Sequence, residues 1–132
     1  MKKLNIFLPL FTLFFLIGLN NLKANDIIDD ITLTIKNTDS KALAKYFSQS
    51  VEIDILNQHN TFTAAQAQLL LNDFFSKNKS TEVKVFHKVT SNPKQQFAVI
   101  LYDTLKLKYR ISLQIGAQNG KLLINHITIE LN

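Results

Sequence analysis

A small group of polar side chains in this sequence could take part in acid–base chemistry. His87 lies in an alternating run and is predicted to share an apolar strand face with Val83 and Val85. An imidazole there could act as a general base or donate a hydrogen bond to a ligand. Asp103 and Asp54 are the candidate carboxylate bases beside it. The competing interpretation makes His87 a hydrogen-bonded core residue and leaves both carboxylates in water.

Two tyrosines are the other candidate functional groups. Tyr102 and Tyr109 stand in successive predicted strands and could form a pair of hydroxyl donors that stabilises a developing negative charge. Together with His87 they are our candidates for the lining of a ligand pocket. Buried tyrosines at the end of a sheet are more commonly packing residues with one satisfied hydroxyl, so packing is the competing interpretation.

The sequence contains no recognisable metal or cofactor motif. It has three histidines and no cysteine. His59 and His126 are far apart, and neither has a carboxylate at ligand spacing. We therefore expect no metal and no cofactor. The absence of cysteine also excludes disulfides, a cysteine nucleophile and a lipid-modified cysteine.

Basic residues are frequent in the C-terminal half of the chain. They could form a surface for anionic glycans or lipid headgroups. A solubilising face that discourages strand edges from pairing is the interpretation we favour. The residues concerned are Lys84, Lys88, Lys106, Lys108 and Arg110.

The N-terminus has the three parts of a secretory signal. Lys2 and Lys3 precede an apolar run from Leu4 to Leu19, and a polar stretch ends at Ala24. The run is shorter than the roughly 20 residues of a membrane-spanning helix and contains Pro9. We therefore predict a signal peptide over residues 1–24, cleaved after Ala24, and a protein exported to the periplasm or the extracellular space. No membrane span is expected after cleavage.

Signal cleavage changes the charge balance. The chain has 15 Lys and Arg against 10 Asp and Glu, and removing Lys2, Lys3 and Lys23 leaves 12 against 10. The basic character is thus largely a targeting feature, and it does not indicate nucleic-acid binding. With 46% hydrophobic residues in the 132, the remainder can form one domain, residues 25–132, with its own core.

Three helices are predicted ahead of the C-terminal sheet. Residues 26–36 have isoleucines at helical spacing and acids in the first turn, although residues 31–35 also alternate like a strand. Residues 40–47 form a short second helix capped by Asp39. The third begins at Thr63 with a capping box to Gln66 and runs to Lys77. Between the last two, residues 51–55 alternate as a strand, and residues 57–60 are predicted to form a turn.

Four strand-like runs fill residues 82–131 and predict an antiparallel sheet. The register of the hairpin over Phe97–Leu113 stays open. An even loop places Ile100 and Tyr102 on the face of Tyr109, whereas an odd loop places Val99 there. In either case an apolar half of residues 97–102 faces away from the helices. We expect a second subunit to cover it, which predicts a homodimer through the outer sheet face.

The order helix, helix, strand, turn, helix and four strands resembles the cone-shaped α+β fold of the nuclear transport factor 2 superfamily. Within it, the chain is similar to a family of small exported bacterial proteins of uncharacterised function. The resemblance implies a curved antiparallel sheet with three helices on its concave face and a pocket at the mouth of the cone. The segments that carry it are Asp39–Phe47, Ala65–Ala67, Asn72–Asn78, Phe86–Lys88, Tyr109–Ile111 and Ile127–Glu130.

Three hypotheses for the function follow. The first is an exported, non-enzymatic domain that binds a small apolar ligand or a protein partner. The second is a small acid–base enzyme of the isomerase or dehydratase kind, which requires His87 to meet Asp103 or Asp54 in a cavity. The third is a structural component of the cell envelope. A ligand-binding cone requires an apolar cavity of roughly 300 Å³ or more.

Overall fold

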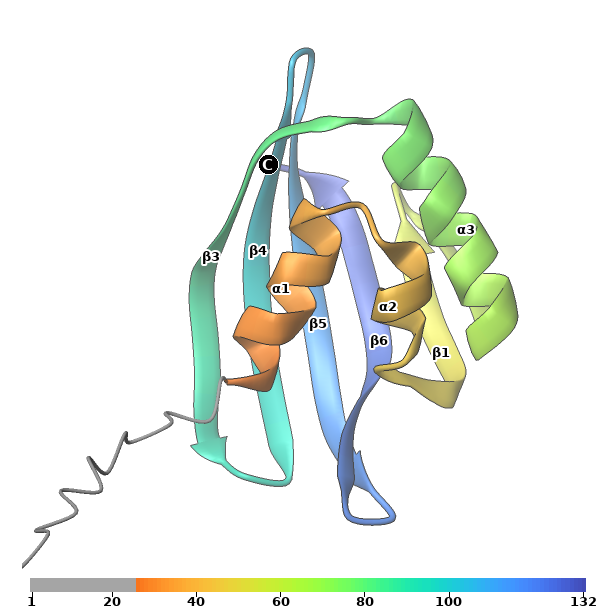
Figure 1. The fold of residues 1–132 in the computed structure, drawn as a ribbon, viewed down its shortest axis with the longest axis vertical. Helices are drawn as coiled ribbons and strands as arrows, with labels where there is room; N and C mark the ends of the chain where they lie inside the picture. Colours follow the sequence, from red (N-terminus) through yellow and green to blue (C-terminus); the bar gives the residue numbers. More distant parts are fainter. Residues whose placement is uncertain (1–25) are drawn as a thin grey trace, which may run out of the picture.

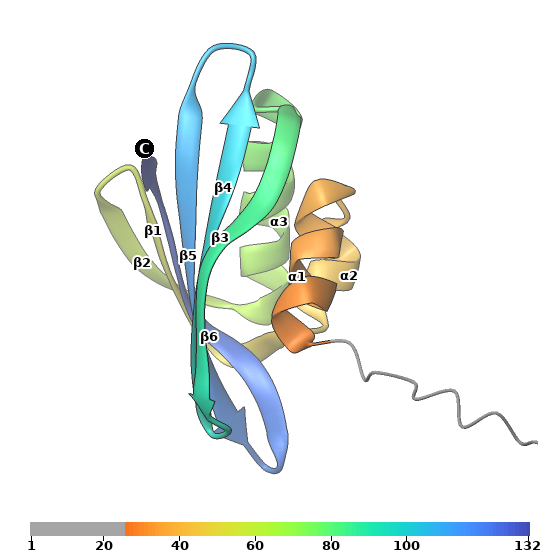
Figure 2. The same cartoon turned by 90° about the vertical axis from the view of Figure 1, so that its left-hand side faces the viewer.

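Six strands form one curved sheet, and three helices cover its concave side (Figure 1 and Figure 2). The computed structural model describes residues 26–132, so the predicted signal peptide lies outside the described residues. The predicted α+β architecture is confirmed. The strands are β1 (Phe47–Ile55), β2 (Gln58–Thr63), β3 (Ser80–Asn92), β4 (Gln95–Thr104), β5 (Lys108–Gln118) and β6 (Lys121–Leu131).

The strand order β2-β1-β6-β5-β4-β3 places the first strand, β1, beside the last strand, β6. β1 runs parallel to β6, with Ile53 opposite Ile127, and every other neighbouring pair is antiparallel. Below, the inner face is the side of the sheet that the helices cover, and the outer face is the opposite side (Figure 2). Because side chains alternate along a strand, this register decides which residues face the helices.

The helices begin at side-chain caps. They are α1 (Ile27–Lys36), α2 (Ser40–Ala44) and α3 (Ala64–Lys77). Asp26 accepts a hydrogen bond from the Ile28 amide at the start of α1, and Thr63 forms the predicted capping box with Gln66 at the start of α3. None of the helices within residues 26–132 has the length and apolar character needed to cross a membrane.

Two predicted boundaries were wrong. The second helix ends at Ala44, and Phe47 already belongs to β1 because it pairs with Ile124 of β6. The predicted turn over residues 57–60 is shorter, since β2 begins at Gln58. Leu56 and Asn57 adopt positive φ angles of 49° and 69° and reverse the chain within two residues.

The open register question has a definite answer. Tyr102 pairs with Tyr109 and Ile100 pairs with Ile111. An even number of residues therefore lies between the paired positions, and these four side chains share one face. Tyr102 and Ile100 are buried against the helices, and Val99 faces outward. Half of the apolar run in β4 therefore lies on the outer face.

A β-bulge in β3 corrects the predicted placement of His87. Val85 pairs with Ile100 but His87 pairs with Val99, so one extra residue enters β3 between them. The shift moves His87 to the exposed outer side and brings Lys88 to the inner side.

On the inner side, the Lys88 ammonium lies beside the start of α1. Its Nζ atom is 2.9 Å from Asp26 Oδ2 and 3.3 Å from Asp29 Oδ1. From the sequence, Lys88 was a candidate for a basic outer surface. Because of the bulge, Lys88 connects the edge strand β3 to the start of α1.

Apolar side chains fill the space between the two layers. The residual cavity measures about 10 Å³ and is lined by residues of α1, α2, α3, β5 and β6. This is at most the volume of one water molecule, far below the roughly 300 Å³ of a ligand site. The cone has a solid interior. The lining residues are Ile35, Leu43, Leu71, Phe75, Ile111, Leu113, Ile127 and Ile129.

The cap of α1 leads to a prediction with a pH signature. Asp26→Ala should lower the free energy of unfolding by about 1 kcal/mol at pH 7, because it removes the cap and the partner of Lys88. Asp26→Asn should cost less, since its amide oxygen can still accept from Ile28. The Ile28 amide, and after it Lys88, hold the pKa of Asp26 below its ordinary 3.8.

The lowered pKa of Asp26 fixes the direction in which stability changes with pH. The contribution of the Asp26 charge is complete above pH 3.8 and is lost as the pH falls through the lower, folded-state value. Urea unfolding gives the free energy of unfolding of wild type and Asp26→Asn. The difference between the two should be smaller at about pH 3 than at pH 7. A difference that grows on acidification would contradict the assignment.

Candidate functional site

The two tyrosines proposed to line a pocket lie in the packed interior. The Tyr102 hydroxyl donates to the backbone carbonyl of Asn78 at 2.5 Å, and the Tyr109 hydroxyl donates to Asn78 Oδ1 at 3.0 Å. The rings pack against Phe74 and Phe75 of α3. Burial raises the pKa of Tyr102. Both hydroxyls are thus satisfied by the end of α3, which is the arrangement of packing residues.

The residues proposed for proton transfer do not converge. His87 is exposed on β3, and Asp54 lies on β1 with three strands between them. Asp103 pairs with Glu82 and Lys108 near one end of β4. Within residues 26–132, no carboxylate lies within ion-pair distance of His87. A base paired with His87 in a cavity therefore has no support in this fold.

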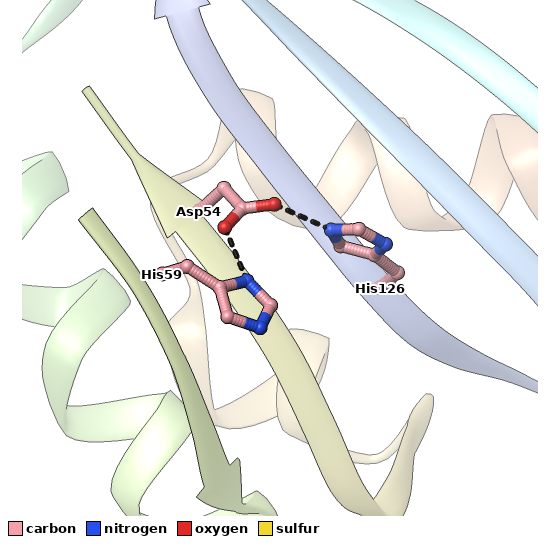
Figure 3. Close-up of side chains that lie close together, drawn as sticks. All are labelled: Asp54, His59 and His126. Atoms are coloured by element: carbon pink, nitrogen blue, oxygen red, sulfur yellow. Dashed lines mark hydrogen bonds and ion pairs between the residues drawn. The ribbon is translucent and has the colours of Figure 1, made fainter. Parts of the chain in front are cut away.

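A different cluster appears on the outer face. Asp54 of β1, His59 of β2 and His126 of β6 point toward one another (Figure 3). One carboxylate oxygen of Asp54 lies 2.7 Å from His126 Nε2, and the other contacts His59 Nδ1. The three potential ligand atoms lie within 4.8 Å of one another. The side chains of Asp54 and His126 keep about a quarter of their surface exposed, and His59 is more exposed.

The strand pairing explains why these residues meet. Asp54 and His59 are directly opposite in the antiparallel β1–β2 ladder. Asp54 is also opposite Thr128 in the parallel β1–β6 ladder, and His126 precedes Thr128 by two residues. Residues two apart on a strand share a face, so His126 projects to the same side as Asp54. The order β2-β1-β6 thus sets the three side chains in a row.

The electrostatics of the cluster favour an ionised carboxylate. The hydrogen bond from His126 is the largest of the effects that hold the pKa of Asp54 below its ordinary value, and His59 adds to it. Among residues 26–132, no lysine or arginine forms an ion pair with Asp54. Glu52 Oε2 lies 3.8 Å from His126 Nδ1, on the far side of the ring. The negative charge of Asp54 therefore faces only imidazoles.

All three residues were candidates from the sequence, but no pattern connected them. Neither histidine has a carboxylate at ligand spacing in the sequence, and the structure supplies that carboxylate from β1. One signal was available: Asp54 and His59 flank a two-residue turn symmetrically and therefore oppose each other. No local pattern indicated the parallel pairing that brings His126 alongside.

A curved sheet closed on its concave side by three helices is a nuclear transport factor 2-like fold. The model of the family described as "Domain of unknown function (DUF4783)" matches residues 28–130. The chain therefore belongs to this family. No curated protein matches it.

Solved structures show the same fold. A family member from Bacteroides uniformis ATCC 8492 has 20% sequence identity and a TM-score of 0.76, over 81% of this chain and 98% of that one. One from Bacteroides fragilis YCH46 has 25% identity and a TM-score of 0.72, over 77% and 95%. A de novo designed protein with a curved β-sheet has 14% identity and a TM-score of 0.61, over 79% and 93%. The last likeness concerns the fold alone.

Proposed function

We propose that this protein is an exported, non-enzymatic binding domain that acts through the outer face of its sheet. The observation that carries the proposal is the filled interior, whose cavity of about 10 Å³ leaves no room for a ligand. An apolar ligand inside the cone is thereby disfavoured, and a protein partner on the surface is favoured. The predicted signal in residues 1–24 supports export.

The outer face of β3 and β4 carries an apolar patch, which we define as Phe86, Val89, Phe97, Val99 and Leu101. Phe86, in the bulge, is 63% exposed, and Val89 is 42% exposed. The three residues of β4 are partly exposed and alternate with buried neighbours. Polar side chains on β5 and β6 border the patch, as at the rim of a protein interface.

The partner we propose is a second copy of the chain. Five strand spacings of about 4.8 Å and strands of about 11 residues give the outer face an area of about 850 Å². Each partner of a stable dimer typically buries about 800 Å². A two-fold contact would bring the apolar patch of each copy against the same face of the other and remove it from water.

Native mass spectrometry of protein recovered from its own cell envelope tests both parts of the proposal. The expected mass is twice that of residues 25–132. Val99→Lys should weaken the dimer more than about 100-fold, because an unpaired buried ammonium costs at least about 3 kcal/mol. Leu69→Lys is the matched control, since Leu69 is 71% exposed on α3, away from this face.

Three outcomes would count against the proposal. A wild-type mass of one chain at micromolar concentration would contradict the dimer. Loss of the dimer in Leu69→Lys, with Val99→Lys still dimeric, would show that the interface lies on the helices and not on the outer face. A mass that includes residues 1–24 would contradict signal cleavage. Circular dichroism spectra matching the wild type would show that the variants are folded.

A further inference from the structure

We propose that Asp54, His59 and His126 form a binding site for a divalent transition-metal ion, with Zn²⁺ as the best match. The site lies on the outer face of β2, β1 and β6 (Figure 3). In the strand order these strands lie toward the opposite edge of the sheet from β3 and β4, which carry the apolar patch. Its ligands belong neither to the apolar patch nor to the filled core, but a dimer that buries the whole outer face would also cover them. Each residue offers one potential ligand atom, and these atoms lie within 4.8 Å of one another.

The geometry is close to what a metal requires. Zn²⁺ binds imidazole nitrogen and carboxylate oxygen at about 2.0–2.2 Å, so the ligand atoms of a tetrahedral site are about 3.3 Å apart. The three atoms here lie within 4.8 Å of one another, with Asp54 Oδ2 at 2.7 Å from His126 Nε2. Small rotations of the side chains would open the cluster to hold an ion. The backbone positions need no change, because three neighbouring strands set them.

The types of ligand atom indicate which metal ions the site would bind. Two imidazoles and one carboxylate suit zinc and its neighbours in the first transition series. Calcium and magnesium prefer an all-oxygen set of six or more ligands, which these three residues do not provide. Three protein ligands leave a fourth position on the outer face, open to water or to a donor from another molecule, including the second copy of a dimer.

Glu52 supplies a second observation in favour of a metal site. In metal sites the ring nitrogen that does not bind the ion commonly donates to a carboxylate, which fixes the ring orientation. Glu52 Oε2 lies 3.8 Å from His126 Nδ1, on the side of the ring away from Asp54. With Nε2 on the ion, His126 Nδ1–H would point toward Glu52. At 3.8 Å the contact is not a hydrogen bond, so Glu52 would become a positioning residue by moving closer to the ring when the ion binds. Its negative charge and that of Asp54 together balance the charge of a divalent cation.

The site also requires the tertiary structure. Its ligands come from positions 54, 59 and 126, so the unfolded chain does not hold them together. An ion that binds only the folded state stabilises it by mass action. Zinc should therefore connect the β1–β2 hairpin to β6 and raise the Tm, roughly by 10 °C at a hundredfold excess over its Kd.

Calorimetric titration of the tag-free protein with ZnCl₂ tests the site, in a buffer that does not bind zinc. One ion per chain should bind, and MgCl₂ should give no binding. His126→Ala and Asp54→Asn should each weaken zinc binding by more than the roughly 10–100-fold expected for Glu52→Gln. His87→Ala is the matched control, because His87 is exposed on β3 and lies outside the cluster.

Thermal unfolding with and without ZnCl₂ supplies a second readout on the same proteins. The zinc-dependent rise in Tm should appear in wild type and His87→Ala and be absent in His126→Ala. Co²⁺ binding to the wild type should give the visible absorption of a tetrahedral or five-coordinate ion. If zinc produces neither a heat of binding nor a rise in Tm with the wild-type protein, the proposal is overturned. The cluster would then be only a hydrogen-bonded network of one aspartate and two histidines. Equal losses in His87→Ala and His126→Ala would overturn the proposal too.

Discussion

Replacing Leu71 with alanine is expected to lower the free energy of unfolding by about 2–5 kcal/mol, the range for large-to-small changes in a packed core. Leu71 is 1% exposed, and it lines the interior between α3 and the sheet. The cavity there is already only about 10 Å³, so the removed atoms leave a void that backbone relaxation closes only partly. Urea denaturation followed by circular dichroism measures the loss.

Leu69→Ala is the matched control for this experiment. Leu69 stands two residues earlier on the same helix, and it is 71% exposed. The same chemical change there should alter stability by no more than about 0.5 kcal/mol. Similar losses for the two variants would show that helix propensity, and not burial against the sheet, governs the effect. That result would contradict the filled interior on which the proposed function rests.

The second large effect is expected at Tyr102. Tyr102→Ala should cost about 3–5 kcal/mol, as other large aromatic truncations do, because the ring is fully buried between α3 and β5. Tyr102→Phe keeps the ring and removes only the hydroxyl that donates to the Asn78 carbonyl. It should cost about 1 kcal/mol. Guanidinium unfolding of both variants separates the contribution of packing from that of the hydrogen bond.

The same pair of variants tests the earlier suggestion that Tyr102 serves a ligand. A packing residue predicts a large loss for alanine and a small loss for phenylalanine. A Tyr102→Phe variant that unfolds as easily as Tyr102→Ala would mean that the hydroxyl, and not the ring, holds the end of α3 to β4. A phenylalanine variant more stable than wild type would argue that the hydroxyl is kept for a function other than packing.

Elements defined by local pattern were predictable. The third helix was predicted over Thr63–Lys77 and observed as Ala64–Lys77, because its capping box and apolar stripe are both local features. The C-terminal strands were predictable for a similar reason, since antiparallel neighbours joined by short turns follow one another in the chain. The resemblance then supplied the arrangement of these elements.

The candidate site was not predictable in the same way. His87 was predicted on the inner face by strict alternation, and one inserted residue in β3 reversed its orientation. His126 was set aside because no carboxylate stands at ligand spacing beside it in the sequence, and the Asp54 that contacts it in the structure is 72 residues away. A bulge and a parallel pairing across that distance leave no periodic signal in a single sequence.

Local sequence patterns were sufficient for the three helices, for five of the six strands and for the absence of cysteine chemistry. These depend on neighbouring residues, whose backbone preferences and apolar periodicity act over a few positions. The filled interior and the meeting of Asp54, His59 and His126 on the outer face depend on the tertiary structure. The reason is that side-chain packing and the parallel β1–β6 ladder join segments from opposite ends of the described chain.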